Sequence, residues 1–90
     1  MSQKRFFEML KQVPRIKHLW SEEKKEIILD VFEKELSVMS PGEVYMAKFF
    51  ASVWFGDNRR YGFDLVDAVA SIDMPERKLI IDWIANPFWP

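Results

Sequence analysis

The sequence contains no cysteine and no threonine, and it has only one histidine and three glycines in 90 residues. The absence of cysteine excludes disulfides, thiolate nucleophiles and zinc–thiolate sites, and it fits a reducing, cytoplasmic environment. The three glycines form no Gly-x-Gly pattern, which argues against a phosphate-binding loop. The single imidazole, His18, has no carboxylate next to it in the sequence to orient it as a base. We therefore expect a protein that is not an enzyme and that carries no cofactor.

Long apolar runs are missing as well. The longest uninterrupted runs span only a few residues, such as Val53 to Phe55, so no membrane-spanning helix is predicted. The basic N-terminus is not followed by the apolar core of a signal peptide, because Glu8 and Lys11 interrupt it. Length and composition predict one cytoplasmic domain that comprises residues 1–90.

Helical spacing of apolar residues and helix-capping signals dominate the chain, and no convincing strand pattern appears. Helices are expected over about 2–12 and 22–39, the second capped by Ser21, with residues 15–20 as a connector. Ser40, Pro41 and Glu43 form a capping box that starts a helix ending before Gly56. Two shorter helices follow Asp64 and Asp73. Leu65, Ala68, Val69 and Ile72 are expected to face inward from the first of these, and the second carries Leu79, Ile80, Trp83 and Ile84.

The helix over about 41–55 is apolar on nearly all sides, with only Lys48 and Ser52 forming a thin polar stripe. A helix that is apolar around most of its circumference must be surrounded by other elements. The sequence therefore predicts an all-α fold, a compact bundle of four to five helices packed around this central helix. Eight Phe and four Trp supply bulky side chains for its core.

Two pairs of carboxylates, Asp64 with Asp67 and Asp73 with Glu76, lie three residues apart. Such a pair can share a proton or contribute to a cation site. Each pair also stands at the expected start of a helix, where side-chain oxygens accept hydrogen bonds from backbone N–H groups. Capping accounts for both pairs, and neither supplies enough ligands for a metal, so no metal site is expected.

Aromatic residues in two segments are candidate anchors for another protein or for a second copy of the chain. Trp, Tyr and Arg are over-represented among the residues that dominate protein interfaces. One segment ends the central helix and enters the following loop, and the other is the C-terminal tail, which either folds back onto the core or stays exposed. The candidate protein-binding residues are Trp54, Phe55, Tyr61, Phe88 and Trp89.

Nucleic-acid binding is the alternative, because the charge is unevenly placed although the net charge is only −1. Residues 1–18 carry five basic and one acidic side chain, whereas residues 61–90 carry two basic and five acidic ones. The two clearest helices show no basic face suited to a groove of DNA. The candidate polyanion-binding residues are Lys4, Arg5, Arg15, Lys17, Arg59 and Arg60.

The segments Ala47 to Trp54 and Gly62 to Asp67, followed by Ile72 and Asp73, show an aromatic-rich helix and then a Gly-Phe-Asp-Leu turn that enters a short helix. In these residues, 47–73, the chain resembles a family of small uncharacterised bacterial proteins found on plasmids and other mobile elements. The resemblance covers about half the chain and does not include residues 1–40. It implies a bacterial, intracellular accessory protein, and it supplies no catalytic residues because the family has no established activity.

Overall fold

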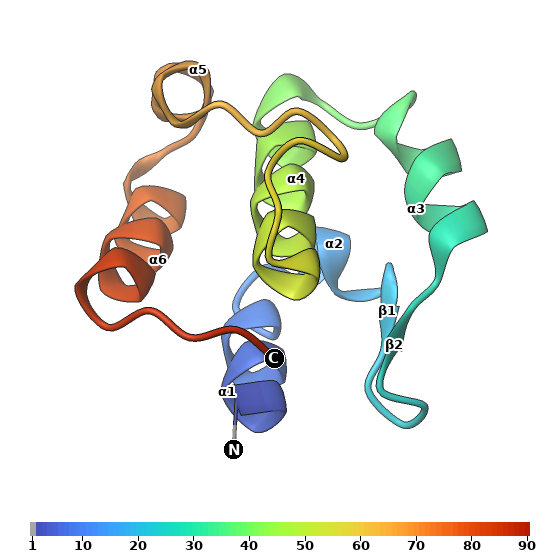
Figure 1. Ribbon diagram of the computed structural model, residues 1–90. Helices are drawn as coiled ribbons and strands as arrows, with labels where there is room; N and C mark the ends of the chain where they lie inside the picture. The colour runs from blue at the N-terminus through green and yellow to red at the C-terminus, as the bar shows by residue number, and fades with distance from the viewer. Residues whose placement is uncertain (1) are drawn as a thin grey trace.

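The computed structural model describes residues 2–90, of which α-helices form the greater part (Figure 1). Helices account for 61% of the chain, and the only sheet in the described residues is a small two-stranded hairpin. The predicted all-α bundle is confirmed, with six helices, one of them a single turn. The elements are α1 (Ser2–Leu10), α2 (Pro14–Lys17), β1 (Trp20–Ser21), β2 (Glu26–Ile27), α3 (Leu29–Leu36), α4 (Pro41–Phe55), α5 (Leu65–Ser71) and α6 (Met74–Ala85).

Helix α4 is the central helix, as its sequence predicts, and its two ends are formed by the expected signals. The Ser40 hydroxyl accepts a hydrogen bond from the Glu43 backbone N–H at 3.4 Å, and Oε1 of Glu43 accepts one from the Ser40 backbone N–H at 3.0 Å. These two bonds form the capping box that satisfies backbone donors of the first turn. Gly56 ends the helix in the left-handed region, at φ 67°, which glycine adopts without strain.

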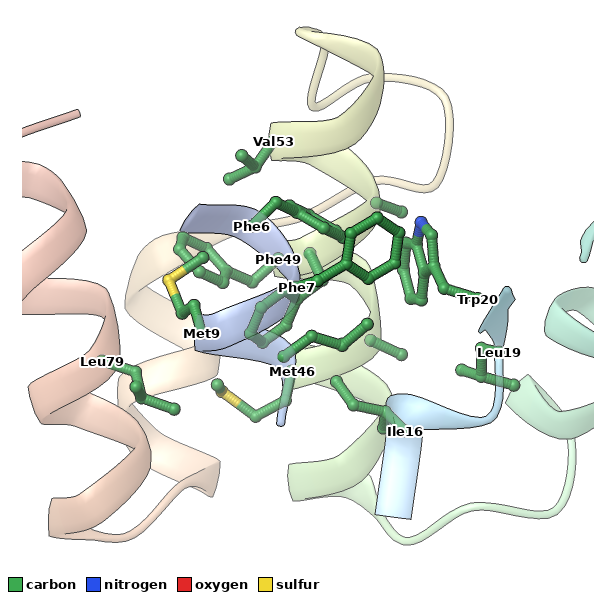
Figure 2. Packing of buried hydrophobic residues seen from close by; sticks show 14 of the residues in the cluster. Phe6, Phe7, Met9, Ile16, Leu19, Trp20, Met46, Phe49, Val53 and Leu79 are labelled. Atoms are coloured by element: carbon green, nitrogen blue, oxygen red, sulfur yellow. The ribbon is translucent and has the colours of Figure 1, made fainter. Parts of the chain in front are cut away.

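The other elements surround α4, with α6 on one side, α3 on the other and α1 and α2 against its lower part (Figure 1). No residue between Gly42 and Phe55 is fully exposed, and six of them are buried. The side chains that pack around α4 come mainly from α1, α2 and the hairpin (Figure 2). Buried members of this core include Phe6, Phe7, Leu10, Ile16, Leu19, Trp20, Phe32, Met46, Phe49 and Phe50.

The prediction of one helix over 22–39, capped by Ser21, is wrong in its first third. The structure has an antiparallel hairpin in which Trp20 pairs with Ile27 and Ser21 with Glu26, and α3 begins only at Leu29. The Ser21 hydroxyl does accept a bond from the Lys24 backbone N–H at 3.1 Å, as an N-cap would. The chain then turns back instead of continuing as a helix.

Burial of Trp20 explains this difference. Its ring lies within a group of aromatic rings, 5.5 Å from that of Phe6 and 5.7 Å from that of Phe32. The turn that leads back places Lys25 at φ 58°, a left-handed conformation that is unfavourable for a residue with a Cβ. A hairpin this short is not stable by itself, so tertiary packing must hold it.

Smaller differences occur in the N-terminal part. The first helix ends at Leu10, slightly before the expected Gln12. Residues 15–20 are not a plain connector, because Pro14 occupies the first position of the one-turn helix α2. Proline is favoured at that position, since its fixed φ suits a helix and its missing N–H would have no partner there.

The C-terminal helices begin where the sequence predicts, but their buried faces are narrower than expected. The Asp64 carboxylate caps α5 by accepting from the Asp67 backbone N–H at 2.9 Å, whereas Asp73 precedes α6 without a side-chain cap bond. Ala68, Ile72, Leu79 and Ile80 are buried as expected. The expectation that Leu65 and Val69 face inward is wrong, because both are exposed. Ile84 of the last helix is exposed as well. In the described part of the chain, no helix has the length and apolar character required to cross a membrane.

Candidate functional site

Three of the five aromatic residues predicted to bind a protein lie at the edge of the core. Trp54, Phe55 and Tyr61 are half-buried and pack against the buried cluster. The Trp54 ring lies 5.0 Å from that of Phe6, and the Tyr61 ring lies 4.7 Å from that of Phe32. The Tyr61 hydroxyl also donates a hydrogen bond to Glu33 at 3.0 Å. These contacts give the three side chains a role in holding the fold together.

The C-terminal tail is docked onto the fold, which answers the question that its sequence leaves open. Phe88 is buried, and its carbonyl oxygen accepts a hydrogen bond from Nε1 of Trp83 at 2.9 Å. The Arg5 guanidinium lies 4.3 Å from the centre of the Phe88 ring. Trp89 contacts the Trp83 ring edge-on, yet 57% of the residue is exposed. Trp89 is therefore the only one of the five that presents a largely exposed ring.

A cleft of about 440 Å³ brings Trp89 together with the predicted polyanion-binding residue Arg59. Its other walls include Phe63 and Trp83. Asp57 already binds Arg59 at this rim, accepting from its Nε at 3.1 Å. The backbone N–H of Arg59, and then its guanidinium, lower the pKa of Asp57, so this carboxylate stays charged beside the arginine.

The six candidate polyanion-binding residues do not form one free basic surface. Arg5 donates a hydrogen bond to the Asn86 carbonyl, and Arg15 forms an ion pair with Glu43 at 2.8 Å. Arg59 is bound to Asp57, and Arg60 lies over the rings of Phe55 and Tyr61. A phosphate would compete with these contacts. Lys4 and Lys17 are exposed and take part in no ion pair within residues 2–90.

Most of the large apolar side chains that are exposed lie elsewhere, on α5 and α6, and none of these is among the predicted binding residues. Among the residues whose burial is described, nine large hydrophobic residues are exposed, and seven of these lie in the range Leu65 to Trp89. Six of them belong to α5 and α6, which follow one another along the side of the molecule opposite α3 (Figure 1). We call these six the apolar flank: Leu65, Val66, Val69, Met74, Ile81 and Ile84.

One sequence signal could have revealed the apolar flank. Apolar residues occur around most of the circumference of α6, as in α4, but α6 lies at the edge of the molecule (Figure 1). Leu79 and Ile80 face the core, so the remaining apolar positions Ile81 and Ile84 face outward. Only one helix in a small bundle can be central, and an apolar peripheral helix leaves one face without a partner.

A second, larger hollow lies beside the junction between α5 and α6. This groove, of about 760 Å³, runs between the α1–α2 turn, the N-terminus of α4 and residues 71–76. Val13, Pro14 and Pro41 line it with accessible apolar surface, above the buried side chains of Met46 and Ile72. Asp73 and Glu76 line it with carboxylates. It has the size and the mostly apolar lining that are usual for ligand sites.

Among residues 2–90, one pair of titratable side chains outside these surfaces resembles part of a catalytic arrangement. Nε2 of His18 lies 3.2 Å from Oε1 of Glu35, so the histidine does meet a carboxylate in space. His18 is exposed, and the pair lines neither of the two clefts described above. No cluster of three or more metal-ligating side chains occurs in residues 2–90.

Comparisons with known proteins add no relative of this chain. No protein-family model matches it, and no curated protein and no solved structure matches it either.

Proposed function

We propose that this protein acts in the cytoplasm by binding another protein, and that the apolar flank with Trp89 is the surface it uses. The exposure of these side chains is the observation that carries the proposal. Val66 is 78% exposed, Met74 62%, Ile81 54% and Ile84 52%. Scattered exposed hydrophobic residues are ordinary, but their concentration on one pair of helices is typical of an interaction site.

The energy available from this surface is sufficient for specific binding. Burying a Val, Ile or Met side chain completely contributes about 1.5–3 kcal/mol. Covering the half that remains exposed is therefore worth about 1 kcal/mol for each of the four residues, before the costs of association. Trp89 adds an aromatic ring of the type that often dominates interface energies.

The charge around the apolar flank favours a different protein over a second copy of this chain. Between Asp64 and Asp82 the chain carries five acidic side chains and two basic ones, Arg77 and Lys78. Lys78 and Asp82 neutralise each other at 3.0 Å. A symmetric dimer through this face would place the remaining acidic groups near their own copies, and like charges across an interface are unfavourable.

The proposal includes no catalytic step, and the absence of enzyme activity stays a prediction. The bacterial and mobile-element setting that the resemblance of residues 47–73 implies also stays a prediction. Both are compatible with an accessory protein whose role is to bind a partner.

Affinity capture from the source cells tests the proposed function, with quantitative comparison of three baits. The wild-type chain should enrich a partner, and the variant Val66→Asp/Ile84→Asp should lose at least nine-tenths of it, roughly the tenfold that 1.4 kcal/mol represents. Val38→Asp is the control, because Val38 is 71% exposed, between Ile84 and Val66 in exposure, but lies between α3 and α4. Equal capture by all three baits would contradict the proposal.

A further inference from the structure

One wall of the groove beside the α5–α6 junction is formed by a close contact between two helices. Gly42, in the first turn of α4, approaches the end of α5 so closely that a Cβ at this position would lie 2.9 Å from the Ser71 carbonyl oxygen. This contact joins the N-terminus of α4 to the C-terminus of α5, so two rigid helices form one wall. Val13 and Pro14 line the groove from the α1–α2 turn.

The polar groups of the groove leave an excess of negative charge. Arg15 and Glu43 line it but neutralise each other at 2.8 Å. The pKa of Glu43 is lowered, chiefly because the Ser40 backbone N–H donates to its carboxylate, so this pair stays charged on both sides. Asp73 and Glu76 form no ion pair with any residue in 2–90, and they leave the groove with a net charge of −2.

The Asp73 carboxylate forms no cap hydrogen bond and no ion pair within residues 2–90. It stands at the N-cap position of α6, where an aspartate normally accepts a hydrogen bond from the helix backbone, yet it forms no such bond. The comparable residue of α5, Asp64, does form its cap bond. Asp73 is therefore an exposed acceptor in a groove whose accessible apolar side chains are those of Val13, Pro14 and Pro41.

We propose that this groove binds a short segment of the partner protein in which apolar side chains are followed by arginine or lysine. The apolar side chains cover Val13, Pro14 and Pro41, and the basic groups meet Asp73 and Glu76. This inference rests on the proposed function, since it describes the kind of segment that the bound protein supplies. Charge complementarity selects the occupant, because an acidic or uncharged segment would leave the two carboxylates without a partner.

A second copy of this chain is a poorer occupant. Its basic N-terminal residues Lys4 and Arg5 are exposed on α1, but the adjoining Phe6 and Phe7 are buried in its own core. A neighbouring copy would thus present charge without apolar side chains. Presenting both would require α1 to leave the core.

Binding of defined peptides to the full chain tests the proposal, with fluorescence polarisation for affinity and amide chemical shifts for location. The probe is fluorescein-labelled Ser-Gly-Leu-Leu-Arg-Arg-Gly-Ser. One control replaces both Arg by Glu, and a second replaces both Leu by Ser. We expect the probe to bind with a Kd below about 1 mM and at least about tenfold more tightly than either control. It should shift the amide signals of the non-proline residues within 12–15, 40–46 and 71–76.

Two double variants test whether the carboxylates of Asp73 and Glu76 contribute to binding of the probe. Asp73→Asn/Glu76→Gln should weaken binding of the probe about fivefold at low salt, because two partly exposed ion pairs are lost. The effect should shrink between about 0.1 M and about 1 M salt. Asp64→Asn/Asp67→Asn removes the same charge from α5, away from the groove, and should change the affinity less than about twofold. Asparagine caps a helix as well as aspartate does, so the variants at positions 64 and 73 are expected to fold.

Several outcomes would overturn the groove assignment. No binding of the probe at about 1 mM would do so, and so would equal binding of the Glu control peptide. Shifts confined to the apolar flank or to the cleft at Trp89 would place the peptide elsewhere. Concentration-dependent dimerisation that protects the groove would identify a second copy as its occupant. The affinity-capture result for Val66→Asp/Ile84→Asp is independent of all of these, so failure of the groove and failure of the proposed function can be told apart.

Discussion

Replacement of Gly42 by alanine has two effects of opposite sign on the free energy of unfolding, one from helix propensity and one from tertiary packing. Alanine is the better helix former, so Gly→Ala within a helix normally stabilises a protein by about 0.5–1 kcal/mol. Gly42 lies in the first turn of α4, at an ordinary helical φ. Helix propensity alone therefore predicts that Gly42→Ala is more stable than the wild type.

Tertiary contact reverses this expectation. The new Cβ would lie 2.9 Å from the Ser71 carbonyl oxygen, closer than such atoms approach in real proteins. The obstacle is backbone at the end of α5, so no side-chain rotation relieves it. Forcing an extra methyl group into a packed contact costs about 1–3 kcal/mol. After subtraction of the gain in helix propensity, we expect Gly42→Ala to lower the free energy of unfolding by about 1 kcal/mol.

Urea denaturation and thermal unfolding followed by circular dichroism measure this change. A loss of about 1 kcal/mol corresponds to a decrease in Tm of about 4–8 °C for a domain of this size. Gly42→Val, with a larger side chain at the same contact, should lose more than Gly42→Ala. A Gly42→Ala protein that is more stable than the wild type would refute the close approach of α4 to α5, and with it the wall of the groove.

Four further outcomes are expected. Phe50→Ala removes a fully buried ring of α4. It should lower the free energy of unfolding by about 3–5 kcal/mol and leave a large fraction of the protein unfolded at 37 °C. Native-like near-ultraviolet circular dichroism at that temperature would contradict the central position of α4. Lys25→Gly should raise the Tm by a few degrees, because glycine occupies φ 58° without strain, and a lower Tm would speak against the hairpin turn. The pKa of Glu43 is lowered in the folded chain relative to its ordinary value of 4.5, so its contribution to stability is present above that pH and is lost as the pH falls through the folded pKa. Glu43→Gln should therefore flatten the decline in stability below about pH 4.5. Parallel acid-denaturation curves of the variant and the wild type would show that the capping box contributes nothing there. Retention on immobilised DNA at low salt should be weak and should not depend on Lys4 and Lys17, whereas strong, salt-sensitive retention that Lys4→Ala/Lys17→Ala abolishes would revive the nucleic-acid alternative.

The candidate site was only partly predictable. The sequence marks Trp89 as an anchor, and it is exposed, but Phe88 has the same local signal and is buried. The difference arises because Trp83 and Arg5, one near and one far in the sequence, hold Phe88 in place. The apolar flank was missed because Leu65, Val69 and Ile84 have the spacing of core residues, and spacing does not say whether a neighbouring element exists to cover them.

Local interactions were readable from the sequence alone, since they involve groups a few residues apart. The capping box at Ser40, the left-handed stop at Gly56, the Asp64 cap and the central place of α4 all follow from residue types and periodicity. Tertiary structure alone decided that residues 20–27 form a hairpin, although the Ser21 signal favours a helix. Burying the Trp20 ring among Phe6, Phe32, Phe50 and Trp54 outweighs the weak local preference, because burial of an aromatic ring is worth kilocalories and helix propensity only tenths per residue.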